Sequence, residues 1–227
     1  MKARLRRVFI TLVTLGLSAT AFTADASLLK PPPGAKVAIV MFEDLQCPDC
    51  SRAYTMVMEE ASAHKIPVVL HDFPLPMHNW AFEGAVWARY FDKTSANLGN
   101  EFRKFVYANQ IQITRDNLPQ WVQKFADENK AEVPNTKDPD GKLAQLVLAD
   151  YSLGQRIGVE HTPTIWVVGN SGVSQPLVEE VKDRDKLAQM IEEMLSKAQP
   201  VAAAKVTSTP KAVARKKKIV KTPKKAG

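Results

Sequence analysis

Short apolar runs and a helical pattern alternate in the first third of the chain. The runs over residues 36–42 and 66–73 have the length and continuity of buried strands. Between them, from 48 to 64, apolar residues recur every three or four positions, which predicts an amphipathic helix. A strand, a helix and a second strand in this order predict a βαβ unit with parallel strands.

A helical pattern continues from residue 77 to about 151. Aromatic and aliphatic residues recur there at helical spacing, and we interpret them as core residues. They form three predicted faces, comprising Trp80, Gly84, Trp87 and Phe91; Phe102, Phe105 and Val106; and Leu118, Trp121, Val122 and Phe125. A turn at 138–141 precedes a further helix.

The last part of the pattern returns to strands and then ends in a helix. Apolar runs at 164–168 and 175–178 flank Gly169-Asn170-Ser171-Gly172, which predicts a hairpin turn. A final helix from Asp183 is predicted to bury Leu187, Met190, Ile191, Met194 and Leu195.

The order of these elements, β-α-β, a helical block and β-β-α, predicts an α/β fold. It is the order of a thioredoxin-type core with an inserted helical subdomain. The predicted division assigns 27–76 to the first half of the core, 77–150 to the helical insertion and 151–199 to the second half.

The two ends of the chain differ in composition from this core. Four basic residues precede an apolar run at 8–17 and the small-residue motif Ala24-Asp25-Ala26, which predicts a secretory signal peptide over 1–26. The run is short for a membrane span, and a retained anchor is the alternative. Residues 200–227 contain nine Lys or Arg residues and no acid, which predicts a disordered tail.

The net charge of +7 comes from these two ends. Residues 27–200 contain 18 basic and 23 acidic residues, a net charge of −5. This balance does not support a core that binds nucleic acid. The basic tail suits weak contact with anionic lipids or polymers of a cell envelope, and a tail that is merely solvated is the alternative.

Both cysteines of the chain lie at the first strand-to-helix junction, in Cys47-Pro48-Asp49-Cys50. A disulfide across so small a ring stabilises a fold by only about 2 kcal/mol, so a reactive dithiol is the better interpretation. Pro48 suits the first helical turn, and helix N–H groups would stabilise a Cys47 thiolate at the N-cap. Cys50 begins the inward stripe of the helix. We therefore predict that Cys47 is an accessible nucleophile and Cys50 a buried resolving thiol.

Three spaced motifs resemble the DsbA-like thiol–disulfide oxidoreductases of the thioredoxin superfamily. They are Phe42-x-Asp44-x-Gln46-Cys47-Pro48-x-Cys50, Asp72-Phe73-Pro74-Leu75 and Gly158-Val159-x-x-Thr162-Pro163-Thr164. The resemblance covers residues 36–197 and implies a cis peptide at Thr162-Pro163 that faces the dithiol, with a plain strand-start proline as the alternative. It also implies backbone pairing of Thr162 with a substrate chain.

The same resemblance implies the partners of the reaction. Substrates would be unfolded or reduced polypeptides, and an unidentified membrane redox partner would reset the dithiol. No cofactor and no metal ion is expected.

Besides Pro48, three positions near the dithiol are predicted modulators. His161 stands where relatives often have glycine, and it would tune the Cys47 thiolate, move protons or simply face solvent. Asp49 stands where strongly oxidising members have histidine; its charge should raise the pKa of Cys47 by about one and make the protein less oxidising than DsbA. Glu43 lies two residues beyond Met41 on the same strand face. It would replace the buried acid of many thioredoxin-type sites, or it is a surface carboxylate.

The sequence thus predicts an exported protein, periplasmic or otherwise extracytoplasmic, that forms or exchanges disulfides through Cys47 and Cys50. Export and family favour net oxidation, whereas Asp49 favours a reductase or isomerase. A metal-binding module that uses both cysteines with His161 is an alternative, although the chain has no second cysteine pair for a zinc site. A redox-inert peptide-binding protein of the same fold is another.

Several residues near strand and helix ends receive a structural interpretation. His64, His71 and His78 lack the spacing of metal ligands. Met77 and Trp80 follow the proline-rich corner; core packing is the favoured role for them, and the rim of a substrate groove is the alternative.

Overall fold

The computed structural model describes residues 25–178 and 184–198. The predicted tail lies outside these residues, and the predicted signal peptide lies almost wholly outside them. The chain begins with a strand–helix–strand unit whose bounds agree with the prediction to within two residues. This unit consists of β1 (Val37–Glu43), α1 (Pro48–His64) and β2 (Val68–Asp72), and the short 3₁₀ helix η1 (Ala26–Leu28) precedes it. β1 and β2 are parallel, as predicted, and Glu43 pairs in register with Asp72 at their carboxyl ends.

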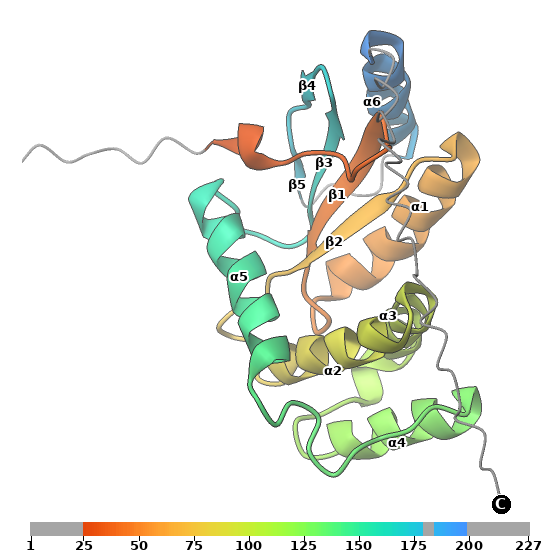
Figure 1. Ribbon diagram of the computed structural model, residues 1–227, viewed down its shortest axis with the longest axis vertical. Helices are drawn as coiled ribbons and strands as arrows, with labels where there is room; N and C mark the ends of the chain where they lie inside the picture. The colour runs from red at the N-terminus through yellow and green to blue at the C-terminus, as the bar shows by residue number, and fades with distance from the viewer. Residues whose placement is uncertain (1–24, 179–183, 199–227) are drawn as a thin grey trace, which may run out of the picture.

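Helices then occupy the middle of the chain. They are α2 (Ala81–Thr94), α3 (Ala96–Asn109), the 3₁₀ helix η2 (Gln110–Gln112), α4 (Leu118–Asn129) and α5 (Lys142–Arg156). Figure 1 shows α2 and α3 side by side below the sheet, with α4 beyond them. α5 passes residue 150, the predicted end of the insertion, and packs on β2. Within the described ranges, no helix is both long and apolar enough to cross a membrane.

The chain returns to the sheet at β3 (Thr164–Gly169), which pairs antiparallel with β1. The strands run in the order β2-β1-β3-β4, and β5 also pairs with β3. The hairpin turn at Asn170-Ser171 is confirmed, because Gly169 pairs with Gly172. The strand predicted at 175–178 is shorter than expected, since it is reduced to β5 (Leu177–Val178), and Pro176, which has no N–H to donate, directly precedes it. A further short strand, β4 (Gly172–Val173), begins at the last residue of the predicted turn.

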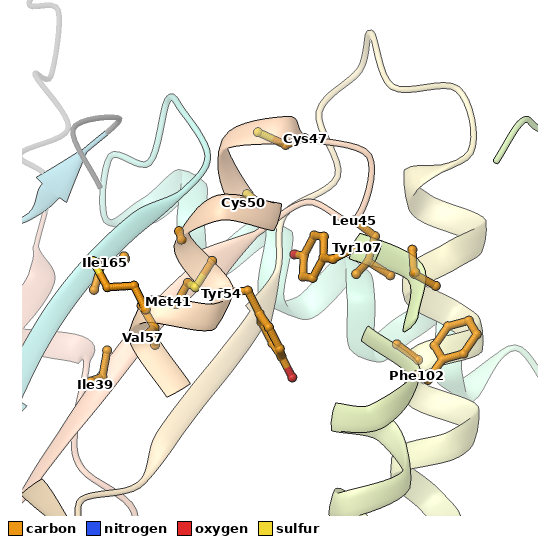
Figure 2. Packing of buried hydrophobic residues seen from close by; sticks show 14 of the residues in the cluster. Ile39, Met41, Leu45, Cys47, Cys50, Tyr54, Val57, Phe102, Tyr107 and Ile165 are labelled. Carbon is orange, nitrogen blue, oxygen red and sulfur yellow. The ribbon is translucent and has the colours of Figure 1, made fainter. Parts of the chain in front are cut away.

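The two faces of β1 pack into different cores. Its alternate residues Val37, Ile39 and Met41 join the core that includes α1 (Figure 2), whereas Val40 and Phe42 pack on the other side. The insertion adds an aromatic cluster in which the ring centroids of neighbouring phenylalanines lie 4.8–5.1 Å apart; its members are Phe91, Phe102 and Phe125. These predicted core residues are confirmed as buried.

α6 (Arg184–Lys197) covers one side of the sheet next to α1 (Figure 1). Its buried stripe, Leu187, Ile191 and Met194, is narrower than predicted. The predicted burial of Leu195 was wrong. Leu195 is 37% exposed, because it lies beside the buried stripe of α6 and not within it.

Candidate active site

Helix α1 begins directly after Cys47, which has extended backbone angles at the N-cap and is followed by Pro48 in the first turn. Cys50 therefore lies one turn further in (Figure 2). Its side chain is completely buried, and its Sγ accepts a hydrogen bond of 3.4 Å from the backbone N–H of Asp44. The buried position predicted for Cys50 is confirmed.

Cys47 is less accessible than predicted. It is only 5% exposed, because the loop before β3 comes over it and the carbonyl oxygen of Thr162 accepts a 3.2 Å hydrogen bond from its Sγ. The Thr162-Pro163 peptide is cis, as the resemblance implied. The tertiary structure thus brings together the dithiol and the loop at Pro163, which are far apart in the sequence. Both cysteines are free thiols.

The two thiols have opposite electrostatic environments. Hydrogen bonds from the Cys50 thiol and backbone lower the pKa of Cys47 from 9.0 to about 6, against the effects of burial and of the Asp44 charge. Burial, together with the neighbouring Cys47, raises the pKa of Cys50 well above its ordinary value. At neutral pH the pair therefore consists of one thiolate and one thiol, which is the charge state needed for nucleophilic attack by Cys47.

Glu43 is a buried acid and not the surface carboxylate of the alternative interpretation. Its side chain is inaccessible to solvent, and it accepts hydrogen bonds from Arg103 Nε at 2.9 Å and from Tyr107 Oη at 2.8 Å. Burial raises the pKa of Glu43 from 4.5 to about 7, although the charge of Arg103 opposes this shift. Glu43 also lies near enough to Cys50 for its charge to raise the pKa of that thiol.

Arg103 holds this acid in place from α3. Its guanidinium group is 2% exposed, donates to both oxygens of Asp92 at 2.9 Å and lies 4.0 Å from Asp72. Asp72 is also paired with Arg89. Sequence reasoning missed this network. The sequence did contain a signal for it. Glu43 and Asp72 stand at the carboxyl ends of two neighbouring parallel strands, and two buried carboxylates at such positions require a buried cation.

Asp44 fastens the loop that leads to Cys47. Its Oδ1 accepts a hydrogen bond from Gln46 N at 2.7 Å, and its Oδ2 accepts one from Leu75 N, also at 2.7 Å. The Nδ1 of His78 lies 2.7 Å from the same Oδ2. Gln46 in turn accepts a hydrogen bond from Trp80 N at 3.0 Å. The proline-rich corner after β2 is therefore tied to the dithiol loop.

Gln110 connects the helical insertion to the same loop. From η2, its Nε2 donates to the carbonyl oxygens of Leu45 at 2.8 Å and of Cys47 at 3.0 Å. No pattern in the sequence pointed to this residue, because a short 3₁₀ turn has no periodicity to read. The insertion thus contributes directly to the geometry of the first turn of α1.

The remaining predicted modulators lie at the surface. Asp49 forms an ion pair with Arg52, and both side chains are exposed. The predicted control of the Cys47 pKa by Asp49 is corrected: that pKa is lowered, and the carboxylate that opposes the thiolate is Asp44. His161 has an exposed side chain, in agreement with the solvent-facing alternative, and borders a cavity of about 510 Å³.

Two further sequence-based interpretations can be compared with the structure. Trp80 is buried, as predicted, but Met77 is 73% exposed, so core packing was wrong for Met77. Among the residues that the structure describes, no group of three or more His, Cys, Asp or Glu side chains is arranged to hold a metal ion.

Comparison with known proteins agrees with this fold. A family model described as thioredoxin matches residues 32–193. The chain therefore belongs to the thioredoxin family, and its fold is that of the DsbA-like members with a helical insertion. No curated protein sequence matches the chain significantly.

Several solved structures share the fold at low sequence identity. The thiol-disulfide exchange protein alpha-DsbA2 from Wolbachia pipientis is 16% identical, with a TM-score of 0.60 over 73% of this chain and 85% of that one. ScsC from Proteus mirabilis is 18% identical, with a TM-score of 0.58 over 74% of this chain and 72% of that one. A periplasmic thioredoxin-like protein from Salmonella enterica serovar Typhimurium is 15% identical, with a TM-score of 0.58 over 74% of this chain and 88% of that one.

Proposed function

We propose that this protein is an extracytoplasmic thiol–disulfide oxidoreductase that acts on polypeptides through Cys47 and Cys50. One observation carries the proposal: a thiol of lowered pKa at a helix N-terminus lies beside a buried thiol of raised pKa and faces the Thr162 carbonyl. A low-pKa thiolate attacks disulfides, and the neighbouring thiol resolves the product.

The chemistry balances without a cofactor. The Cys47 thiolate attacks one sulfur of a substrate disulfide, forms a mixed disulfide and releases the other sulfur as a thiolate. Cys50 then loses its proton and attacks the Cys47 sulfur, which releases the second substrate sulfur. The protein now carries a Cys47–Cys50 disulfide and the substrate has gained two electrons. The same steps in reverse oxidise a substrate dithiol and leave the protein reduced.

Export and partners belong to the same proposal. A signal-peptide pattern at the N-terminus and the periplasmic Salmonella relative support a site outside the cytoplasm. We favour net oxidation of unfolded or reduced polypeptides, with a membrane redox partner that restores the disulfide, because that compartment favours disulfides. The basic tail would add weak contact with the anionic envelope.

Cysteine variants test the function directly. With purified protein, we expect the wild type to reduce insulin in the presence of a thiol and to reoxidise a reduced, unfolded substrate. Cys47→Ser should abolish both reactions, because no thiolate is left to attack. Cys50→Ser should instead accumulate mixed disulfides at Cys47, because the resolving thiol is missing. Equal rates for the wild type and Cys47→Ser would favour the redox-inert peptide-binding alternative.

The reduction potential is predicted from the environment of Cys47. Its pKa of about 6 lies between the values of about 3.5 for DsbA and about 7 for thioredoxin. Stabilising the thiolate stabilises the reduced form, so we expect a potential between about −270 mV and about −120 mV. Equilibration with glutathione, followed by trapping of free thiols, measures it. A value at the DsbA end would contradict the prediction of a weaker oxidant.

Exposed apolar side chains at the edge of the site support a polypeptide substrate. Ile111 is 99% exposed and directly follows Gln110, which contacts the Cys47 carbonyl. Met77 is 73% exposed and lies in the corner that Asp44 fastens. Replacing both with serine should slow exchange with an unfolded polypeptide by about fivefold, because apolar burial on binding is lost. Exchange with a small disulfide should be unchanged.

A matched control for this double variant is Leu146→Ser. Leu146 is 52% exposed on α5 and lines a cavity that does not include the dithiol. Leu146→Ser should leave both the reaction with a polypeptide and the reaction with a small disulfide unaltered. If the control slows the polypeptide reaction as much as the double variant does, the apolar side chains beside the dithiol have no special role.

A further inference from the structure

A buried carboxylate lies at the base of the dithiol loop. The Asp44 side chain has no exposure to solvent, and both of its oxygens accept hydrogen bonds from backbone N–H groups, of Gln46 and Leu75 respectively. Its own backbone contacts both cysteines, since Asp44 N donates to Cys50 Sγ and Asp44 O accepts from Cys47 N at 3.0 Å. The carboxylate that shapes the loop is therefore held close to the reactive sulfur.

This arrangement carries an electrostatic cost for the reaction. A negative charge near a sulfur disfavours its thiolate, and the Asp44 charge raises the pKa of Cys47. Burial raises the pKa of Asp44, whereas its hydrogen bonds with Leu75 N, His78 and Gln46 N stabilise the charged carboxylate. The site therefore needs a cation that offsets Asp44 without disturbing the loop.

His78 is placed to supply that cation. Its Nδ1 lies 2.7 Å from Asp44 Oδ2, and its side chain is 19% exposed. It borders a cavity of about 370 Å³ whose other lining side chains are uncharged, including Pro74, Leu75, Phe82, Leu148 and Tyr151. The charge of an imidazolium at this position therefore acts chiefly on Asp44.

We propose that His78 is a positioning residue that sets the charge beside Cys47: as an imidazolium it cancels the charge of Asp44, and as an imidazole it leaves that charge opposed to the thiolate. This inference rests on the proposed function, in which the Cys47 thiolate is the nucleophile. It assigns to the proline-rich corner a role in controlling the reactive fraction of Cys47. His78 touches neither sulfur and acts through Asp44.

Other ionisable groups lie near the dithiol in the structure or the sequence. Glu43 and Tyr107 interact electrostatically with Cys50, Asp49 and Arg52 form an exposed pair on the first turn of α1, and His161 precedes the Thr162-Pro163 peptide. Variants at position 78 leave all of these groups in place. A change in the ionisation of Cys47 between such variants therefore reports the charge at position 78.

The test compares His78→Asn with His78→Lys. Asparagine keeps a hydrogen-bond donor near the Nδ1 position but carries no charge, whereas lysine keeps the charge and loses the imidazole geometry. The ionisation of Cys47 is followed by the ultraviolet absorbance of its thiolate against pH, in reduced full-length protein. Near pH 6, where Cys47 is about half ionised, His78→Asn should lower the ratio of thiolate to thiol by about three- to tenfold. His78→Lys should keep the wild-type ratio or exceed it.

Asp44→Asn and the double variant Asp44→Asn/His78→Asn complete the comparison. Removing the Asp44 charge should raise the ratio, and the second substitution should then have no further effect, because its partner charge is gone. His64→Asn is the matched control, since His64 contacts Glu60 at the far end of α1 and should leave the ratio unchanged.

Two results would overturn the proposal. In the first, His78→Asn leaves the ratio unchanged; in the second, His78→Lys lowers it as much as asparagine does, which shows that hydrogen-bond geometry matters and charge does not. This contrast decides the question even if Asp44→Asn fails to fold. Because the absorbance is measured without substrate, a wild-type protein that fails to exchange disulfides would refute the proposed function without altering this readout.

Discussion

Replacing Arg103 with methionine is expected to lower the free energy of unfolding by about 3–5 kcal/mol at neutral pH. Arg103 is almost completely buried and pairs with Glu43 and with both oxygens of Asp92 at 2.9 Å. Methionine fills similar space but leaves these carboxylates, together with nearby Asp72, without their shared cation. The desolvation cost of the acids is then uncompensated. Urea unfolding at neutral pH measures the loss.

The pH dependence of this variant separates charge from packing. Below pH 5 the buried Glu43, whose pKa is already raised, takes up a proton, so part of the lost stability should return. Arg52→Met is the matched control, because Arg52 makes an ion pair with Asp49 in which both side chains are exposed, and water screens such a pair. A loss of stability in Arg103→Met that is small, or equal at both pH values, would contradict the electrostatic account.

Glu43→Gln is expected to slow the resolving step by about a hundredfold at neutral pH. Cys50 must lose its proton as it attacks, and burial raises its pKa well above the ordinary value. Glu43 lies close to it with a pKa of about 7, which suits a proton acceptor at neutral pH. Glutamine has the same shape and cannot accept the proton. Stopped-flow measurement of the decay of a mixed disulfide at Cys47 gives the rate.

The wild-type rate should rise through about pH 7 as Glu43 ionises, whereas the rate of Glu43→Gln should lack this rise. Glu101→Gln is a control on the exposed side of α3 and should behave as the wild type. An unchanged resolving rate in Glu43→Gln would show that water accepts the proton.

Although Glu43→Gln should slow the resolving step, it should increase the stability of the folded protein at high pH. Because the folded state raises the pKa of Glu43 from 4.5 to about 7, the contribution of Glu43 to stability is greatest below pH 4.5 and is lost as the pH rises through 7. Glu43→Gln removes this loss, which is about 3 kcal/mol in an upper estimate. It should therefore be more stable than the wild type above pH 7 and similar near pH 4. Arg103 keeps Asp92 as a partner in this variant, so no buried cation is left unpaired.

Local patterns were sufficient to predict much of the fold. The bounds of β1 and β3 follow from continuous apolar runs and those of α1 from helical periodicity, and the N-cap position of Cys47 follows from Pro48 after an apolar strand. Predictions were weaker where a pattern was short or depended on neighbours. The last predicted strand was reduced to Leu177–Val178, and Leu195 fell outside the buried stripe of α6.

The candidate site divides in the same way. The sequence by itself determined the position of the two cysteines, because a dithiol at a strand-to-helix junction is a local feature of four consecutive residues. Only the tertiary structure decided what surrounds the pair. Thr162 lies 115 positions from Cys47, and Arg103 lies 60 positions from Glu43. The charge and solvation of a buried group depend on distances through space, and these exist only when the helices and strands are packed.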